Sequence, residues 1–187
     1  MNINFVPLAD SHFPLLLKWL EMPHVKLWWD QEIKWNLELI KQKYLSYIKG
    51  YKLQNNEPKK IQAYIVKVNR TPVGYIQIYN AHDFEQANLL INLPPNLAAI
   101  DFFLGELEYL NKGIGILTLK TFLENFIDKE FSHILVEPDS KNIAAIKTYE
   151  KVGFKIIGGN EKILMIKENN KNLRIITYNF DSFIVSC

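Results

Sequence analysis

The sequence predicts a mixed α/β domain built on a mostly antiparallel sheet that contains one parallel pair of strands and is flanked by helices. Three observations support this prediction. Two β-rich segments, "IQAYIVKV" and "VGYIQIYN", are separated by only four residues, as in a hairpin. Further on, a strand, a helix and a strand follow one another, which gives a parallel pair with a right-handed crossover. No repeat or linker divides the 187 residues, so we expect one domain, 1–187, with a core over about 5–167 and an extension over about 168–187.

Four segments have apolar residues at the spacing of amphipathic helices. The second of them runs to Gly50 and the fourth to Gly153, and glycine is the usual residue at a helix C-terminus. The third follows a turn with two glycines. The predicted helices are 13–20, 33–48, 116–127 and 143–152.

The remaining strands are short and apolar. After the hairpin, a long connection with two prolines leads to "AIDFFLGEL", and loops of that length tend to carry function. Alternation along this strand puts Asp101, Phe103 and Gly105 on one face and the aliphatic residues on the other. The other predicted strands are "HILVE", "KIIGG", "KILMIK" and "LRIITYNF".

Composition excludes several classes of function. The net charge is only +2 and no basic stripe is present, so we expect no nucleic-acid partner. No apolar stretch approaches the ~20 residues of a membrane span and no signal peptide is evident, so we expect a cytoplasmic protein without a membrane partner. A single cysteine, Cys187, and four scattered histidines predict no metal site. Catalysis must therefore use carboxylates, hydroxyls and backbone amides.

The segment "YLNKGIGILTLK", residues 109–120, predicts a phosphate site. Gly113 and Gly115 let the backbone approach a ligand, and the amides of the helix start carry partial positive charge. A dinucleotide fingerprint would need a third glycine at Thr118, and a P-loop would need Gly-Lys-Ser/Thr; neither is present. The pattern that fits is a glycine turn over a pyrophosphate, with Lys112 as an added counter-charge. A plain turn is the alternative.

Three separate features then coincide: the "KGIG" turn, a strand ending in "VEPDSKN", and a helix reading "AAIKTYEKVGF". Together they resemble the GNAT acetyltransferase superfamily. The resemblance implies a GNAT fold whose parallel strands splay at an acetyl-CoA site, with acetyl-CoA as cosubstrate and no metal. Leu110 stands where the family often has Gln or Arg. The residues that the resemblance assigns to acetyl-CoA are Leu110, Asn111, Lys112, Gly113, Ile114, Gly115, Ile116 and Asn142.

The segments "MPHVKLWWDQ" and "AID" resemble, more narrowly, the aminoglycoside 6'-N-acetyltransferases. This similarity runs from about Leu16 to about Ile157. It implies an enzyme that acetylates the 6'-amine of an aminoglycoside by direct attack in a ternary complex, with Asp101 as general base and Tyr149 as general acid. Residues that the resemblance places against the acceptor are Trp28, Trp29, Asp83, Glu85, Asp101 and Glu137.

Each of these assignments has a structural alternative. Asp101 could be a solvated surface charge, and Glu137 could cap the helix that follows it. The paired tryptophans and Tyr149 could be packing residues. Two other functions stay open: transfer to a siderophore hydroxylamine or another small amine, because the long loop has few acids, and a non-catalytic CoA-binding module, because of Leu110. In each case we expect a small-molecule partner and a monomer or homodimer.

Overall fold

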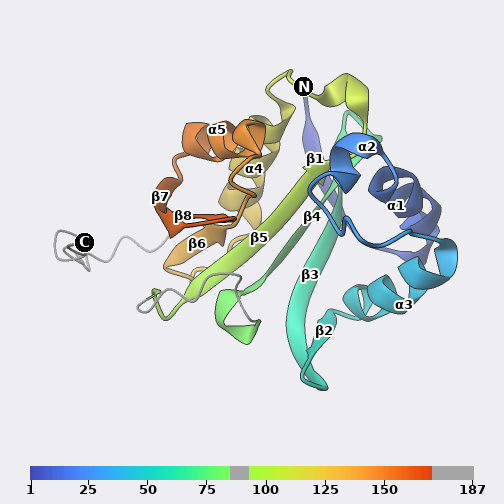
Figure 1. Ribbon diagram of the computed structural model, residues 1–187, viewed down its shortest axis with the longest axis horizontal. Coiled ribbons are helices and arrows are strands. Elements are labelled where there is room, and N and C mark those ends of the chain that lie inside the picture. Colours follow the sequence, from blue (N-terminus) through green and yellow to red (C-terminus); the bar gives the residue numbers. More distant parts are fainter. Residues whose placement is uncertain (85–92, 170–187) are drawn as a thin grey trace.

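The computed structural model describes residues 1–84 and 93–169, and an eight-stranded sheet runs through them (Figure 1). The strand order is β1-β3-β4-β5-β6-β8-β7, with β2 paired to β3. The predicted strand 173–180, most of the predicted extension and Glu85 lie outside the described residues. The strands are β1 (Ile3–Pro7), β2 (Tyr51–Gln54), β3 (Glu57–Val68), β4 (Thr71–Asn80), β5 (Leu97–Leu104), β6 (His133–Val136), β7 (Lys155–Gly159) and β8 (Ile163–Glu168).

The predicted hairpin is confirmed as β3 and β4. Asn69 and Arg70 form its two-residue turn, and both have positive φ, 48° and 82°. Two consecutive residues of this kind make the turn whose twist matches that of the flanking strands. Strands β1 and β2, which also pair with β3, were not predicted.

The predicted parallel pair is also confirmed, and it is short. Strands β5 and β6 pair over only three residues each, ending at Ala99 and Leu135. Strand β5 then continues to Leu104 in antiparallel pairing with β4 alone. The two parallel strands therefore separate from residue 100 onward, as expected for a GNAT fold.

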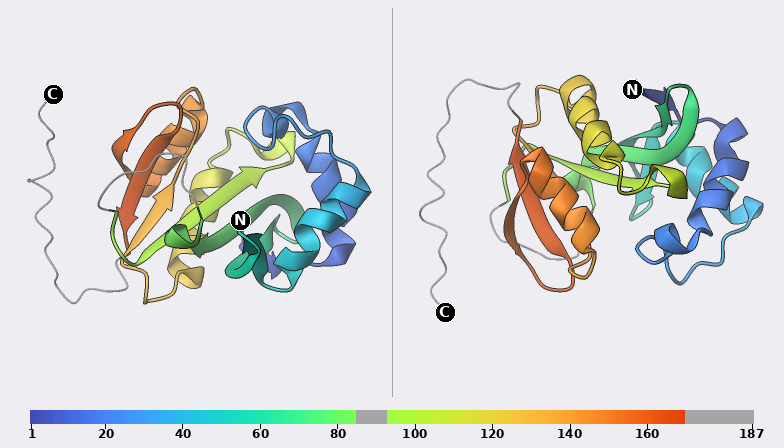
Figure 2. Two further views of the ribbon diagram at one scale, coloured as in Figure 1. Left: turned by 60° about the horizontal axis from the view of Figure 1, so that its bottom comes forward. Right: turned by 90° about the horizontal axis from the view of Figure 1, so that it is seen from above.

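Helices cover both faces of this sheet (Figure 2). On one face, α4 and α5 pack on aliphatic residues of the central strands, among them Ile76, Ile100 and Ile134. On the other face, α1 and α3 pack on an aromatic cluster that includes Tyr75 and Phe103. The helices are α1 (Phe13–Leu20), α2 (Pro23–Lys26), α3 (Leu37–Ile48), α4 (Ile114–Phe126) and α5 (Ile143–Val152), with 3-10 turns η1 (Asp10–His12), η2 (Ala81–Asp83) and η3 (Leu107–Tyr109).

The predicted start of the second long helix is wrong. This helix begins at Leu37 and not at Ile33, because the Asn36 side chain caps it by accepting a hydrogen bond from the Leu39 amide at 3.0 Å. Its end at Gly50, with φ of 84°, agrees with the prediction. The short helix α2 was not predicted.

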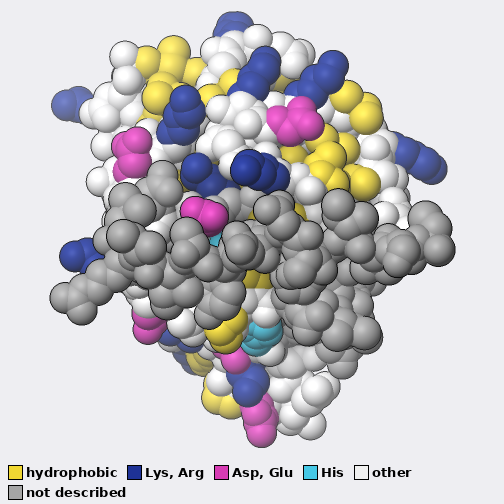
Figure 3. Space-filling view, turned by 90° about the vertical axis from the view of Figure 1, so that its left-hand side faces the viewer, with side chains coloured by type: hydrophobic (Ala, Val, Ile, Leu, Met, Phe, Trp, Pro, Cys, Tyr) yellow, Lys and Arg dark blue, Asp and Glu magenta, His cyan; other side chains and the backbone are white. Residues whose placement is uncertain are grey.

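Edge strand β7 lies on the side of the molecule drawn in Figure 3. Where Figure 3 colours the side chains of this side, Lys and Arg lie among uncharged and acidic ones. Within residues 1–84 and 93–169, no helix is long and apolar enough to cross a membrane.

Candidate active site

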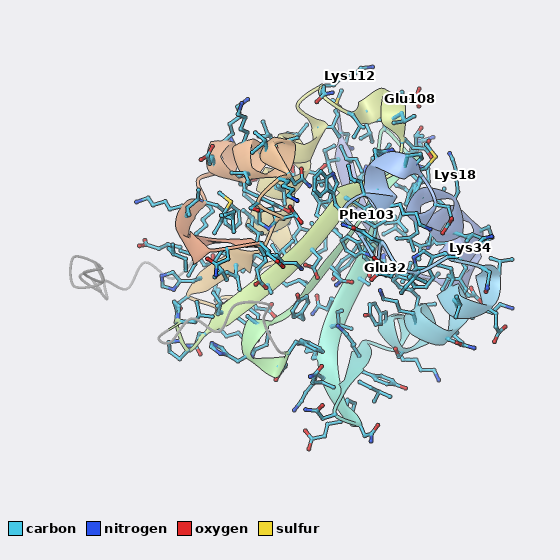
Figure 4. The ribbon with its side chains drawn as sticks, in the orientation of Figure 1. Lys18, Glu32, Lys34, Phe103, Glu108 and Lys112 are labelled. Carbon is cyan, nitrogen blue, oxygen red and sulfur yellow. The ribbon has the colours of Figure 1, made fainter. Side chains whose placement is uncertain are left out.

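The glycine turn forms an open cradle at the start of α4. Gly113 is the N-cap residue of this helix and has φ of 75°, and Asn111 before it also has positive φ. A Cβ added at Gly113 would meet nothing within 4 Å, and no side chain caps the helix. The amides of the first turn have no partner within the helix, so they are available to an anion. Lys112 is exposed beside them, and Figure 4 shows it in the turn before α4.

The other residues of the turn have different tasks. A Cβ at Gly115 would lie 3.5 Å from Thr148 Cγ2, which is an ordinary van der Waals contact. Gly115 therefore faces α5. Ile114 is buried, and Ile116 packs against the same core. The predicted contacts of Leu110, Ile114 and Ile116 with a pyrophosphate would therefore use main-chain groups.

Asp101 lies two residues beyond Ala99, the last residue of β5 that pairs with β6. Its side chain is half-buried and accepts a hydrogen bond from Gln77 Nε2 at 2.6 Å. Burial, and next the interaction with Asp101, raise the pKa of the Tyr79 hydroxyl. Since Phe103 belongs to the aromatic cluster, the alternation of β5 turns Asp101 toward α1 and α3, as predicted. Figure 4 shows Phe103 near the centre of the molecule, on β5.

Trp29 contributes to the aromatic cluster beside this carboxylate. Its ring centroid is 4.9 Å from that of Phe103 and 6.0 Å from that of Tyr75, both edge to face. Trp28, the next residue back, is 37% exposed. The structure thus separates the two tryptophans, because one packs on the sheet and the other lies at the surface.

Tyr149 reaches the site from the opposite side. It is buried on α5, and its ring packs on Phe154 at 5.6 Å. Burial, and next the charge of Asp101, raise the pKa of Tyr149. The phenol is therefore protonated at neutral pH, which is the form that can donate a proton. The influence of Asp101 on Tyr149 therefore acts between residues on the two faces of the sheet.

Glu137 follows β6 and is half-buried. Its charge contributes to raising the pKa of Tyr79, after burial and the effects of Asp101. The alternative that Glu137 caps α5 is wrong, because Asn142 does so by accepting from the Ala145 amide at 3.1 Å. Asn142, predicted to bind acetyl-CoA, therefore has a structural task as well.

One lysine, Lys52, interacts electrostatically with Asp101, and it was not predicted. A second lysine, Lys43, interacts with Lys52 and is paired with Asp30 at 2.6 Å. The Lys52 ammonium lies 4.7 Å from the centroid of the Phe84 ring. Burial lowers the pKa of Lys52, and the charge of Asp101 opposes this. A site that binds a polycation is expected to be surrounded by negative charge. The positive charge of Lys52 near Asp101 departs from that expectation.

Asp83 belongs to another part of the surface. It lines a cavity of about 230 Å³ together with Lys60, Phe126 and Asp128, on the α4 side of the sheet. Asp101 faces the other side, so the described contacts do not bring these two carboxylates together. Across the two described ranges, no group of three or more His, Cys, Asp or Glu residues could hold a metal ion.

A model of the acetyltransferase (GNAT) domain matches residues 9–160. The chain belongs to the GNAT acetyltransferase family. The predicted fold and the predicted N-acetyltransferase class are confirmed at this level.

Relatives within the GNAT family are consistent with this result. Aminoglycoside N(6')-acetyltransferase type 1 of Klebsiella pneumoniae is 28% identical over 149 residues, 79% of this chain and 71% of that protein. A kanamycin resistance protein of Rhizobium radiobacter is 36% identical over 61 residues, 32% of this chain and 56% of that one. The solved structure of AAC(6')-Ib with paromomycin and acetyl-CoA has a TM-score of 0.79 at 24% identity, covering 93% and 97% of the two chains.

Sequence reasoning missed Gln77, which donates a hydrogen bond to Asp101, and Tyr79, whose pKa the charge of Asp101 contributes to raising. A signal was present, because alternation in "VGYIQIYN" puts Tyr75, Gln77 and Tyr79 on one face. The sequence did not show how β4 and β5 are aligned. The structure places Gln77 directly opposite Asp101 in the β4–β5 ladder.

Proposed function

We propose that this protein is an acetyl-CoA-dependent N-acetyltransferase that acetylates the 6'-amine of aminoglycosides by direct attack in a ternary complex. The observation that carries the proposal is the position of Asp101: a half-buried carboxylate two residues beyond the last paired residues of β5 and β6, held by Gln77. The names of the curated relatives support the choice of acceptor. Since one continuous sheet runs through the described residues, we also propose that the chain is a single domain.

The residues of the cradle fit the diphosphate of coenzyme A. The amides of the first turn of α4 point outward, and the empty space beside Gly113 gives an anion access to them. Lys112 adds a positive charge. When bound, acetyl-CoA supplies the acetyl group as a thioester.

Asp101 and Tyr149 divide the proton transfers between them. A sugar amine is mostly protonated at neutral pH, so Asp101 first binds the ammonium and then accepts its proton, directly or through water. Tyr149 donates its hydroxyl proton to the departing sulfur. Attack is direct, because no described residue of the site is an activated nucleophile that could carry the acetyl group.

The test is thiol release from acetyl-CoA by the purified protein with a pair of matched acceptors. Neomycin has a 6'-amine and paromomycin has a hydroxyl at that position. We expect release with neomycin and kanamycin but not with paromomycin, and a product acetylated at the 6'-nitrogen by NMR. Equal release with neomycin and paromomycin, or none with either, would overturn the proposed acceptor.

Lys52 favours a second candidate, transfer to a small amine with fewer positive charges, such as a hydroxylamine of a siderophore precursor. Its ammonium is close enough to Asp101 for the two charges to interact, and a polycation would be repelled there. A panel of mono-amines and hydroxylamines in the same assay distinguishes the two candidates. Tight binding of acetyl-CoA by calorimetry without transfer to any of them would instead indicate a non-catalytic module.

A further inference from the structure

Gln77 is a buried amide in the middle of the sheet, and both ends of it are hydrogen-bonded. It is 6% exposed. The Tyr75 hydroxyl donates to Gln77 Oε1 at 2.7 Å, and Gln77 Nε2 donates to Asp101 Oδ2 at 2.6 Å. Tyr75 is fully buried, so this chain of hydrogen bonds begins inside the aromatic cluster and ends at the half-buried carboxylate.

Chemistry fixes the direction of this chain. An ionised carboxylate only accepts hydrogen bonds, so the amide must turn its NH₂ group to Asp101 and its oxygen to Tyr75. Tyr75 must then donate, and burial raises the pKa of its hydroxyl, which keeps the proton in place. The hydrogen bond from Gln77 is stronger while Asp101 is ionised, because a charged acceptor strengthens it.

We infer that Gln77, oriented by Tyr75, is a positioning residue that holds Oδ2 of Asp101 and so fixes the orientation of the carboxylate that takes a proton from the acceptor. This inference rests on the proposed role of Asp101 as general base. A hydrogen bond donated to a carboxylate favours its charged form. The substrate amine must also reach the carboxylate, and it would compete with any donor that binds the same oxygen. By fixing Oδ2, Gln77 also fixes the direction of Oδ1.

Other titratable groups interact with Asp101, and they are Tyr79 and Tyr75 on β4, Tyr44 and Tyr47 on α3, Tyr149 on α5 and Lys52 on β2. Burial raises the pKa of each of these tyrosines, so the phenols stay neutral on the acidic side of neutrality. Two further carboxylates, Asp30 and Glu137, act on the same tyrosines, so the NMR experiment must follow the assigned signal of Asp101 itself.

The chain offers a matched control on the neighbouring strand. The Tyr64 hydroxyl donates to Gln62 Oε1 at 2.9 Å, which is the same pair of residue types at the same separation. Tyr64 packs against Phe122 and Phe126, on the α4 side of the sheet. Gln62→Met therefore removes the same group from the other face.

The experiment measures two quantities in wild type, Gln77→Met, Tyr75→Phe and Gln62→Met. One is the pH at which the side-chain carbon signal of Asp101 titrates by NMR in the free protein. The other is the acidic limb of the profile of kcat/KM against pH with neomycin. We expect both to move up by roughly one pH unit in Gln77→Met, by less in Tyr75→Phe, and not at all in Gln62→Met, since a hydrogen bond to a charged group has about this strength. At the optimum, kcat should fall about tenfold in Gln77→Met while KM changes less.

The outcomes separate this inference from the proposed function. An unchanged NMR titration in Gln77→Met, or an equal shift in Gln62→Met, would overturn the inference. A shifted NMR titration with an unmoved acidic limb would remove Asp101 as the base, and the positioning role with it. If wild type acetylates no aminoglycoside, the proposed acceptor fails, and the NMR measurement on the free protein still decides whether Gln77 holds the carboxylate. Tyr75→Phe keeps the ring and therefore serves if Gln77→Met does not fold.

Discussion

The two faces of the sheet carry the same Tyr–Gln pair in different surroundings. On the α4 side, Tyr64 donates to Gln62, and within the described chain no further hydrogen bond extends that pair. On the other side, Tyr75 donates to Gln77, and the pair continues to Asp101. The difference lies in the register, because Gln62 is opposite Ile78 and Gln77 is opposite Asp101. A polar pair within a strand can act in catalysis only when a reactive side chain, here Asp101, lies opposite it on the neighbouring strand.

The rest of each face follows this division. The α4 side is a core of aliphatic residues and phenylalanines, and the glycine turn lies at the start of α4. The α1–α3 side is rich in aromatic residues and also holds the hydrogen bonds from Tyr75 to Gln77 and from Gln77 to Asp101. Tyr149 packs in the core of the α4 side and interacts electrostatically with Asp101 on the other side.

Replacing the carboxylate should have the largest effect. We expect Asp101→Asn to lower kcat/KM by about 10²–10⁴-fold, the range in which a positioned general base contributes. Asp128→Asn makes the same change on the α4 side and should leave the rate unchanged. Steady-state kinetics with one accepted amine, together with the melting temperature of each variant, provides the measurement. Equal losses in both variants would mean that the two faces do not differ in function.

Removing the hydroxyl of Tyr149 should have the next largest effect. Tyr149→Phe keeps the ring that packs on Phe154 and removes only the proposed acid, so we expect kcat to fall by about 10²-fold with little change in melting temperature. Tyr64→Phe is the control from the same face. If kcat stays within a factor of two, Tyr149 is a packing residue and a different group, or water, protonates the leaving thiolate.

Most elements of the fold could be predicted from the sequence, because local patterns specify them. Positive φ at Asn69 and Arg70 makes the hairpin turn, and Gly153 ends α5 with φ of 99°. The start of α3 was predicted too early, since apolar spacing continued back to Ile33 while the Asn36 cap decided the boundary. Strand β2 is only four residues long and pairs with the end of the long β3, so it left little periodicity to detect.

The candidate site was predicted only in part, and the reason is again the register. Asp101, Tyr149 and Gly113 could be proposed from the sequence because strand alternation, the glycine turn and the family resemblance point to single residues. Gln77 and Lys52 interact with Asp101 from other strands, and sequence spacing does not show which residues lie opposite one another. For Asp83, the sequence did not show that the fold places it in the lining of a cavity on the α4 side.

The cradle on the α4 side can be tested by a single methyl group. A Cβ at Gly113 would occupy the open space in front of the helix amides, so Gly113→Ala should weaken binding of coenzyme A by about tenfold and cost about 1–2 kcal/mol of stability through its positive φ. Gly50→Ala is a matched control: φ is 84° there, and the nearest atom to the added Cβ is 3.9 Å away. Calorimetric titration with coenzyme A should show a loss of affinity in the first variant alone, although both lose stability. If both variants lose affinity for coenzyme A, the loss in Gly113→Ala comes from destabilisation of the fold and not from a blocked binding site.

Removing the cation near Asp101 should have the smallest effect, and its sign distinguishes the two candidate acceptors. The ammonium of Lys52 repels a polycation bound at Asp101, so Lys52→Met should lower KM for neomycin by roughly two- to fivefold at low ionic strength. The difference should shrink near physiological salt, where charges are screened over about 8 Å. Lys41→Met, on the exposed face of α3, removes one charge from the same part of the protein and should change KM little. If Lys52→Met instead raises KM for an amine that carries a carboxylate and leaves KM for neomycin unchanged, Lys52 binds the natural acceptor, and that acceptor bears a negative charge.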